Sequence, residues 1–220
     1  MSLHDIYTVS VTGRQWLSDE TFELSFSHPT GFAYLAGQKV GFTGAGEGRE
    51  YTLLGPPHIS ELAICARLIP NGRFTPLLAD AAIGDQFQIT AASGFFTFKP
   101  SSRPAVFIAT GTGIAPFVAF VRAGVRGFNL LHGVRSADEL YYRSELAPAA
   151  ARYIPCITGG FDPYKNPHAF AGRVDACLHE RFEPGAYDFY LCGRTEMLRD
   201  VSRLIDRRFE GSSVFTEAFF

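Results

Sequence analysis

The sequence has little that would hold a metal ion. Its 220 residues include four cysteines, Cys65, Cys156, Cys177 and Cys192, and no two of them form a Cys-x-x-Cys pair. Zinc sites and plant-type [2Fe–2S] clusters need closely spaced thiolates, so neither is expected and we predict no metal site. Dispersed cysteines also favour reduced thiols and a cytoplasmic location.

Long apolar runs and an excess of charge are also missing. The longest apolar region, residues 105–121, is interrupted by Thr-Gly-Thr-Gly and is not expected to span a membrane. The start of the chain is short and polar, so no signal peptide is expected. A net charge of −2 gives no general attraction to nucleic acid or to anionic membranes. Hydrophobic residues make up 46% of the chain, enough for a packed core in one large domain or two smaller ones.

The first hundred residues are predicted to form a small antiparallel β-barrel. Short stretches rich in strand-forming residues are separated by Gly and Pro turns, as in closed barrels. One short helix is expected over residues 75–82. The expected strands cover residues 6–11, 22–26, 38–43, 49–54 and 61–68.

A different pattern begins after residues 99–104 (Lys-Pro-Ser-Ser-Arg-Pro), which have the composition of a linker. Strands and helices then alternate, which predicts a parallel α/β sheet with its ligand site at the carboxyl ends of the strands. The domains are therefore predicted as 1–99 and 104–220. The expected strands are 105–109, 128–132, 153–157, 187–191 and 214–219, and the expected helices are 114–124, 137–147, 173–182 and 195–209.

Three stretches are suited to binding phosphate groups. In residues 110–116 (Thr-Gly-Thr-Gly-Ile-Ala-Pro), Gly111 and Gly113 lie between an expected strand and helix, where backbone N–H groups can approach an anion. In the barrel, Arg49, Tyr51 and Thr52 combine a cation, a flat ring and a hydroxyl, and Gly72 to Thr75 lead into the short helix with Thr75 as its N-cap. Each stretch alone is also compatible with an ordinary turn or strand. Together they favour two bound nucleotides.

These residues resemble the ferredoxin–NADP⁺ reductase family, its bacterial branch above all. Arg49-Glu50-Tyr51-Thr52 and Gly72-Arg73-Phe74-Thr75 are similar to its two flavin motifs, and residues 93–96 are similar to the end of its barrel. Residues 110–116 match its NAD(P) pyrophosphate loop, and Cys192-Gly193 matches the pair beside the nicotinamide. The resemblance covers nearly the whole chain.

The resemblance implies a role for each matched residue. Arg49 would contact the flavin pyrophosphate, Tyr51 the isoalloxazine and Thr52 the region of N5, with Phe220 over the other face of the ring. The remaining implied flavin contacts are Glu50, Ala66, Gly72, Arg73, Phe74, Thr75 and Thr112. The implied NAD(P) contacts are Thr110, Gly111, Thr112, Gly113, Arg135, Arg173, Cys192 and Gly193.

Some of these roles stay open at the level of sequence. Thr52, Cys192 and Glu217 are the candidate catalytic residues, although Glu217 is equally compatible with a solvated strand position. Arg135 and Arg173 suit a 2′-phosphate, but a further arginine of the NADP-dependent enzymes is replaced here by Thr158-Gly159-Gly160. The choice between NADP and NAD is therefore left open.

By this resemblance, the predicted function is electron transfer between NAD(P)H and a one-electron protein carrier, ferredoxin or flavodoxin, through bound FAD rather than FMN. Arg199, Arg203 and Arg207 share one helix face that would suit an acidic carrier, or simply face solvent. Two alternatives stay open: an NAD(P)H:flavin reductase that uses flavin as a substrate, and an electron-transfer or regulatory subunit without hydride chemistry.

Overall fold

The computed structural model describes residues 5–43, 49–165 and 167–219. The chain divides into two compact units. Unit 1 comprises Met1–Phe98 and Val118–Ala123, and unit 2 comprises Lys99–Phe117 and Gly124–Phe220. The two units are described separately below. Among the described residues, no helix combines the length and the apolar character needed to cross a bilayer.

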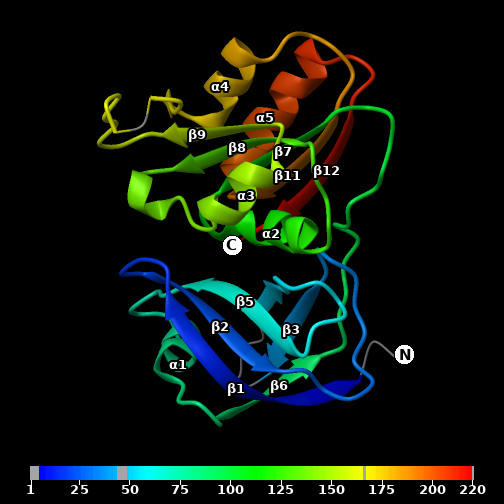
Figure 1. The fold of residues 1–220 in the computed structure, drawn as a ribbon, viewed down its shortest axis with the longest axis vertical. Coiled ribbons are helices and arrows are strands. Elements are labelled where there is room, and N and C mark those ends of the chain that lie inside the picture. Colours follow the sequence, from blue (N-terminus) through cyan, green and yellow to red (C-terminus); the bar gives the residue numbers. More distant parts are fainter. Residues whose placement is uncertain (1–4, 44–48, 166, 220) are drawn as a thin grey trace. The chain divides into compact units, whose positions relative to one another are not determined.

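Unit 1 is built on six antiparallel strands in the order β4-β3-β6-β1-β2-β5. The two edge strands meet through a bridge between Leu53 and Ile64 and an N–H···O bond from Leu54 to Ala63 of 2.8 Å, which closes the sheet into a barrel. This confirms the predicted barrel (Figure 1). Its elements are β1 (Ile6–Trp16), β2 (Thr21–Ser27), β3 (Lys39–Thr43), β4 (Arg49–Thr52), β5 (Glu61–Arg67), α1 (Thr75–Asp80) and β6 (Gln86–Thr90).

The barrel core is aromatic and aliphatic. Phe22, Phe26 and Phe42 are fully buried, and Leu78 and Ala79 bring the short helix α1 onto the same core. Strand β6 was not predicted. Its five residues alternate between polar and apolar side chains, with Phe87 and Ile89 as the apolar ones, so a local signal was present. Pairing with β1 and β3 confirms it as a strand.

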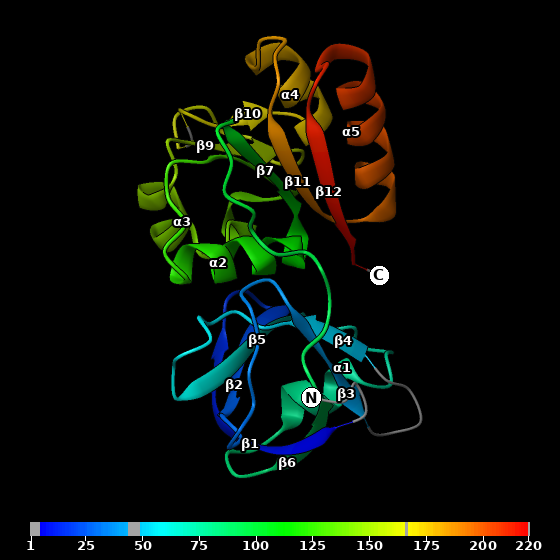
Figure 2. The ribbon, with the colours of Figure 1, turned by 90° about the vertical axis from the view of Figure 1, so that its right-hand side faces the viewer.

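Unit 2 is a parallel sheet in the order β10-β9-β8-β7-β11-β12, as the alternating pattern predicts. Helices α4 and α5 cover one face, and α3 and the start of α2 cover the other (Figures 1 and 2). The elements are β7 (Ala105–Thr110), the 3₁₀ turn η1 (Gly111–Ile114), α2 (Ala115–Arg122), β8 (Asn129–Val134), the 3₁₀ turn η2 (Ala137–Glu139), α3 (Arg143–Ala149), β9 (Arg152–Ile157), β10 (Phe170–Ala171), α4 (Val174–Arg181), β11 (Asp188–Gly193), α5 (Thr195–Arg208) and β12 (Ser213–Ala218).

The helix expected over residues 137–147 is wrong as a single element. The chain forms η2, turns at Tyr142 with a left-handed φ of 58°, and only then begins α3. Leu140, Tyr141 and Tyr142 are all buried. Three consecutive side chains lie about 100° apart around a helix, so one helix could not bury all three against the same sheet.

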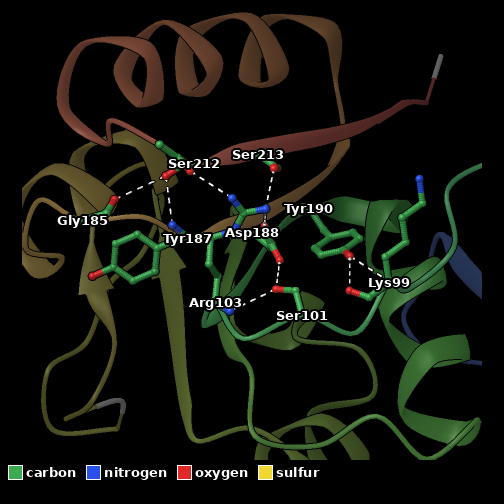
Figure 3. Close-up of polar contacts among 10 residues, drawn as sticks. Lys99, Ser101, Arg103, Gly185, Tyr187, Asp188, Tyr190, Ser212 and Ser213 are labelled. Carbon is green, nitrogen blue, oxygen red and sulfur yellow. Dashed lines mark hydrogen bonds and ion pairs between the residues drawn. The ribbon is translucent and has the colours of Figure 1, made fainter.

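The linker-like segment after the barrel is bound tightly to unit 2. Asp188, at the start of β11, forms an ion pair with Arg103 at 2.6 Å and accepts a hydrogen bond from the Ser101 hydroxyl. Arg103 also donates to Ser213 Oγ at 2.7 Å and to the Gly211 carbonyl at 3.0 Å (Figure 3). We call Ser101, Arg103, Asp188 and Ser213 the Asp188 cluster. Residues 99–104 have the composition of a linker, yet the polar side chains of this segment hold its backbone in a fixed path.

Candidate functional site

The candidate site of unit 1 is the end of β4. Arg49 and Glu50 are exposed, Tyr51 is half-buried and Thr52 is buried, with 2% of its surface exposed. Because successive residues of a strand point to opposite faces, Tyr51 and Thr52 present different chemistry to the two sides of the barrel wall. Glu50 forms an ion pair with Lys39 of β3, with Nζ and Oε2 2.7 Å apart.

The Tyr51 ring is held by neighbouring aromatic rings. It meets Phe42 edge-on at 5.6 Å between centroids and lies nearly parallel to Phe74 at 6.3 Å. Burial raises the pKa of the Tyr51 phenol to about 12, slightly offset by the charge of Arg49. The phenol is therefore neutral at ordinary pH, and the ring is a fixed, uncharged surface.

Thr52 stands out because its hydroxyl oxygen is buried without a hydrogen-bond partner among the described residues. A buried hydroxyl that lacks a partner is unfavourable by about 1–3 kcal/mol, and such groups are rare in folded proteins. An exogenous ring nitrogen or oxygen would satisfy it. The barrel residues therefore fit a polar planar ligand such as a flavin.

The second barrel motif forms a tight turn before α1. A Cβ on Gly72 would lie 3.0 Å from the Ile69 carbonyl oxygen, so a larger residue would have to shift the backbone of this turn. The sequence suggested Thr75 as the N-cap of α1, and this prediction is wrong. The N-cap is Phe74, and the Thr75 hydroxyl accepts the Ile69 N–H at 2.9 Å, which closes the turn. Arg73 is exposed, and Ala66 directs its methyl group into the barrel core, which leaves only its backbone for a ligand.

The candidate site of unit 2 lies where the chain order of the sheet reverses, between β7 and β11. Thr110 ends β7, and Gly111, with a φ of +56°, begins the turn η1. A Cβ on Gly113 would strike the Cys192 carbonyl, and a Cβ on Gly193 would strike the Thr110 hydroxyl. Glycine at both positions lets the two strand ends approach closely. This is the place where open α/β sheets bind nucleotides.

Neighbouring residues complete this strand end. Thr110 Oγ1 accepts the Arg194 N–H at 3.4 Å, and Phe219 N–H donates to the Gly193 carbonyl at 3.0 Å. Cys192 is buried and pairs directly with Glu217 of β12. Paired residues of parallel strands point to the same face, so the two candidate catalytic side chains of unit 2 are neighbours. Thr112, in η1, is half-buried, and Phe220 lies outside the described residues.

The two candidate phosphate-binding arginines lie along the same edge of the sheet. Arg135 follows β8, and its side chain runs over Gly159, where a Cβ would lie 3.2 Å from Arg135 Cγ. Arg173 precedes α4 and donates to Asp175 at 3.1 Å and to Asp200 at 2.9 Å. Hydrogen bonding and charge from Asp175, reinforced by Asp200, raise the pKa of Arg173 above its ordinary value.

Four residues at this edge were missed by sequence reasoning. A Cβ on Gly133 would meet Val174 Cγ1 at 2.8 Å and Thr110 Cγ2 at 3.0 Å, so this glycine lets the start of α4 approach the end of β7. Glu139 accepts the N–H groups of Arg135 and Ser136, at 2.8 and 3.3 Å. Its Ser-x-x-Glu spacing is a capping-box signal that could have revealed it. Asp175 and Asp200, which bind Arg173, are the other two. Asp175 is two positions from Arg173 in the sequence, whereas Asp200 is 27 positions away and gives no local signal.

The fold and the candidate sites of the two units indicate a two-domain nucleotide-binding protein of the oxidoreductase class. The family model for the oxidoreductase NAD-binding domain matches residues 107–203. The flavodoxin/ferredoxin–NADP reductase of Escherichia coli is 26% identical over 222 residues, which cover 90% of this chain and 88% of that protein. A ferredoxin NADP⁺ reductase structure from Neisseria gonorrhoeae has the same fold, with a TM-score of 0.82 over 98% of this chain and 99% of that one, at 22% identity. Over nearly its whole length the chain is thus similar to flavodoxin/ferredoxin–NADP reductases, and it shares their fold.

Reductase components of oxygenase systems are also similar. The toluate 1,2-dioxygenase electron transfer component of Pseudomonas putida is 26% identical over 214 residues, which cover 90% of this chain and 63% of that protein. The chain spans only 50% to 63% of the length of oxygenase reductase components such as this one.

Proposed function

We propose that this chain is a flavoprotein reductase that passes electrons from NAD(P)H to a one-electron protein carrier of the ferredoxin or flavodoxin type. The barrel, residues 1–99, is proposed as the flavin-binding domain and residues 104–220 as the NAD(P)-binding domain. The observation that carries the proposal is the buried Thr52 hydroxyl, which has no hydrogen-bond partner among the described residues and directly follows Tyr51 on β4.

The bound flavin, proposed to be FAD, would supply the change from hydride to single-electron transfer. The chain's residues would bind and orient it. Arg49 is proposed to hold its pyrophosphate, Tyr51 to lie against the ring system, Thr52 to hydrogen-bond the ring, and the Gly72–Thr75 turn to contact its phosphates. Phe220, outside the described residues, is proposed from the family resemblance to cover the ring.

In unit 2, residues 110–113 are proposed to hold the pyrophosphate of the nicotinamide nucleotide, with Cys192 and Gly193 beside the nicotinamide. Glu217, paired with Cys192 in the sheet, is proposed to hold a proton near the reacting ring. Arg135 and Arg173 would line the adenosine end. A cytoplasmic location is proposed from the dispersed cysteines, all four of which are buried free thiols.

The proposal is tested by an anaerobic titration of the purified full chain with NADH and with NADPH, followed by flavin absorbance. We expect bound flavin whose oxidised band, roughly at 450 nm, bleaches on addition of nucleotide. Protein that purifies without flavin yet oxidises NAD(P)H when flavin is added would instead be a flavin reductase. Bound flavin that neither nucleotide reduces would indicate an electron-transfer or regulatory subunit.

A further inference from the structure

The guanidinium of Arg173 is already bound by two carboxylates of its own chain. Its Nε donates to Asp175 Oδ1 at 3.1 Å and its Nη2 to Asp200 Oδ2 at 2.9 Å. The other oxygen of Asp200 accepts Arg199 Nε at 3.2 Å. We call Asp175 and Asp200 the carboxylate pair. Together they occupy the Nε–Nη2 edge of Arg173, one of the edges with which an arginine grips an oxyanion bidentately.

Arg173 lies at the end of the sheet where the adenosine half of a dinucleotide is expected. The neighbouring Gly172 N–H donates to the Ile157 carbonyl at the end of β9, at 2.9 Å. Val174, the residue after Arg173, lies close to Thr110 at the start of the pyrophosphate loop because Gly133 between them has no side chain. In dinucleotide-binding sheets, the side chains beyond the first strand and its loop decide between a 2′-hydroxyl and a 2′-phosphate.

The charges at this edge do not favour a 2′-phosphate. A phosphate monoester carries a charge of about −1.5 to −2 at neutral pH. Asp175 lies 3.1 Å from Arg173, so a phosphate bound by this arginine would lie beside a carboxylate. Glu139 adds a third carboxylate beside the backbone of Arg135. The three carboxylates balance Arg135, Arg173 and Arg199, and Thr158-Gly159-Gly160 adds no cation. A neutral ribose hydroxyl meets no such repulsion.

We propose that the carboxylate pair makes this chain select NADH over NADPH, by engaging Arg173 and by repelling a 2′-phosphate. The inference rests on the proposed function, because it concerns the nucleotide that would reduce the bound flavin. It identifies Asp175 and Asp200 as specificity-determining residues that act through Arg173.

The test compares the flavin-loaded full chain with the Asp175→Asn/Asp200→Asn double variant. Two quantities are measured: kcat/KM with NADH and with NADPH, and the dissociation constants of NAD⁺ and NADP⁺ by calorimetry. We expect the unaltered chain to favour the 2′-hydroxyl nucleotide by about tenfold or more in both measurements. In the double variant this preference should shrink about tenfold, through better NADPH and NADP⁺ binding, with the values for NADH and NAD⁺ within about twofold.

Two further variants sharpen the result. Asp206→Asn removes an exposed carboxylate of α5 for which the structure gives no contact with Arg173, and should leave the preference unchanged. Arg173→Ala should affect the two nucleotides equally in the unaltered chain. In the double variant, where Arg173 is released, the same change should weaken NADPH alone, which a merely structural ion pair would not produce.

An unaltered chain that prefers NADPH, or a double variant with an unchanged preference, would overturn the inference. Failure of the proposed function gives a different result. If bound flavin is not reduced by either nucleotide, the reductase proposal fails, yet the ratio of NAD⁺ to NADP⁺ dissociation constants still decides the inference. If calorimetry detects neither nucleotide, the inference is overturned as well.

Discussion

At the scale of single residues, Thr52 gives a prediction that separates stability from function. Its hydroxyl is buried and unpartnered among the described residues, so it does not stabilise the ligand-free fold. We predict that Thr52→Val, which keeps the side-chain shape, leaves the free energy of unfolding of the flavin-free protein unchanged or raises it by about 1 kcal/mol. The same change should slow reduction of the bound flavin by about tenfold or more, measured by stopped-flow absorbance.

A matched control is available in the same barrel. Thr90 Oγ1 accepts the Gly41 N–H and donates to the Ala91 carbonyl, both at 2.9 Å. Thr90→Val breaks both bonds, and we expect it to destabilise the protein by about 1–2 kcal/mol. If Thr52→Val lost as much stability as Thr90→Val, the hydroxyl would have a structural partner and its proposed role toward the flavin would be wrong.

His132 predicts how stability depends on pH. The side chain is fully buried on β8, with Nδ1 2.9 Å from the Tyr153 hydroxyl, and burial lowers the pKa of the ring from 6.5 to about 3. Between these values the unfolded chain binds a proton that the folded chain does not, so this residue makes stability fall as pH falls from about 6.5 toward 3. The slope is at most about 1.4 kcal/mol per pH unit.

We expect His132→Gln to flatten this dependence in urea unfolding curves recorded between pH 7 and pH 5, the useful part of that window. His168→Gln changes an exposed histidine and should leave the slope as it is. A slope that stays the same in His132→Gln would mean that other groups account for the acid sensitivity.

At the scale of elements, the Asp188 cluster joins the segment after the barrel to the starts of β11 and β12. Asp188 is 4% exposed, and its removal leaves Arg103 without its carboxylate partner. We predict that Asp188→Ala lowers the free energy of unfolding by about 2–3 kcal/mol, measured by urea unfolding. Asp206→Ala, at an exposed position of α5, should have little effect.

A double-mutant cycle separates this interaction from simple truncation. If Arg103 and Asp188 stabilise the fold through each other, Arg103→Ala should add little further loss to Asp188→Ala. Losses that add fully would show that the two side chains act independently, against the arrangement in Figure 3.

The sequence predicted the order of the elements well, and the partners of individual side chains poorly. Buried parallel strands such as β7 are continuous apolar runs and can be recognised locally. Strand β10 has only two residues, and its pairing with β9 defines it, so no local pattern could reveal it. Glycine positions such as Gly113 followed from the turn motif. Asp200 reaches Arg173 from 27 positions away, and only the packing of α4 on α5 brings them together.

At the scale of the whole molecule, the charge distribution bears on the electron partner. The chain is net acidic, yet Arg203 and Arg207 are exposed on α5 without an ion pair to any described residue, whereas Arg199 is paired with Asp200. We predict that Arg203→Glu/Arg207→Glu slows NAD(P)H-driven reduction of an acidic ferredoxin by about tenfold at low salt. Reduction of ferricyanide, a small acceptor, should change little.

Salt provides the second half of this test. Attraction between opposite charges is screened, so the rate with ferredoxin should fall as salt rises in the unaltered chain and depend less on salt in the variant. The double variant Arg126→Glu/Arg143→Glu changes the net charge equally at exposed positions outside α5. If the rate of ferredoxin reduction fell equally in both variants, the effect would come from overall charge, and α5 would not be the docking surface.

The glycine contacts and the carboxylate pair involve different residues, and this has a consequence for how nucleotide preference can change. A Cβ on Gly113 would strike the Cys192 backbone and a Cβ on Gly193 would strike the Thr110 hydroxyl, so a side chain at either position would push the two strand ends apart. Asp175, in the first turn of α4, and Asp200, within α5, are partly exposed side chains of other elements and can change without disturbing that contact. A protein that keeps this turn could thus exchange one nicotinamide nucleotide for the other by a few point mutations outside the turn.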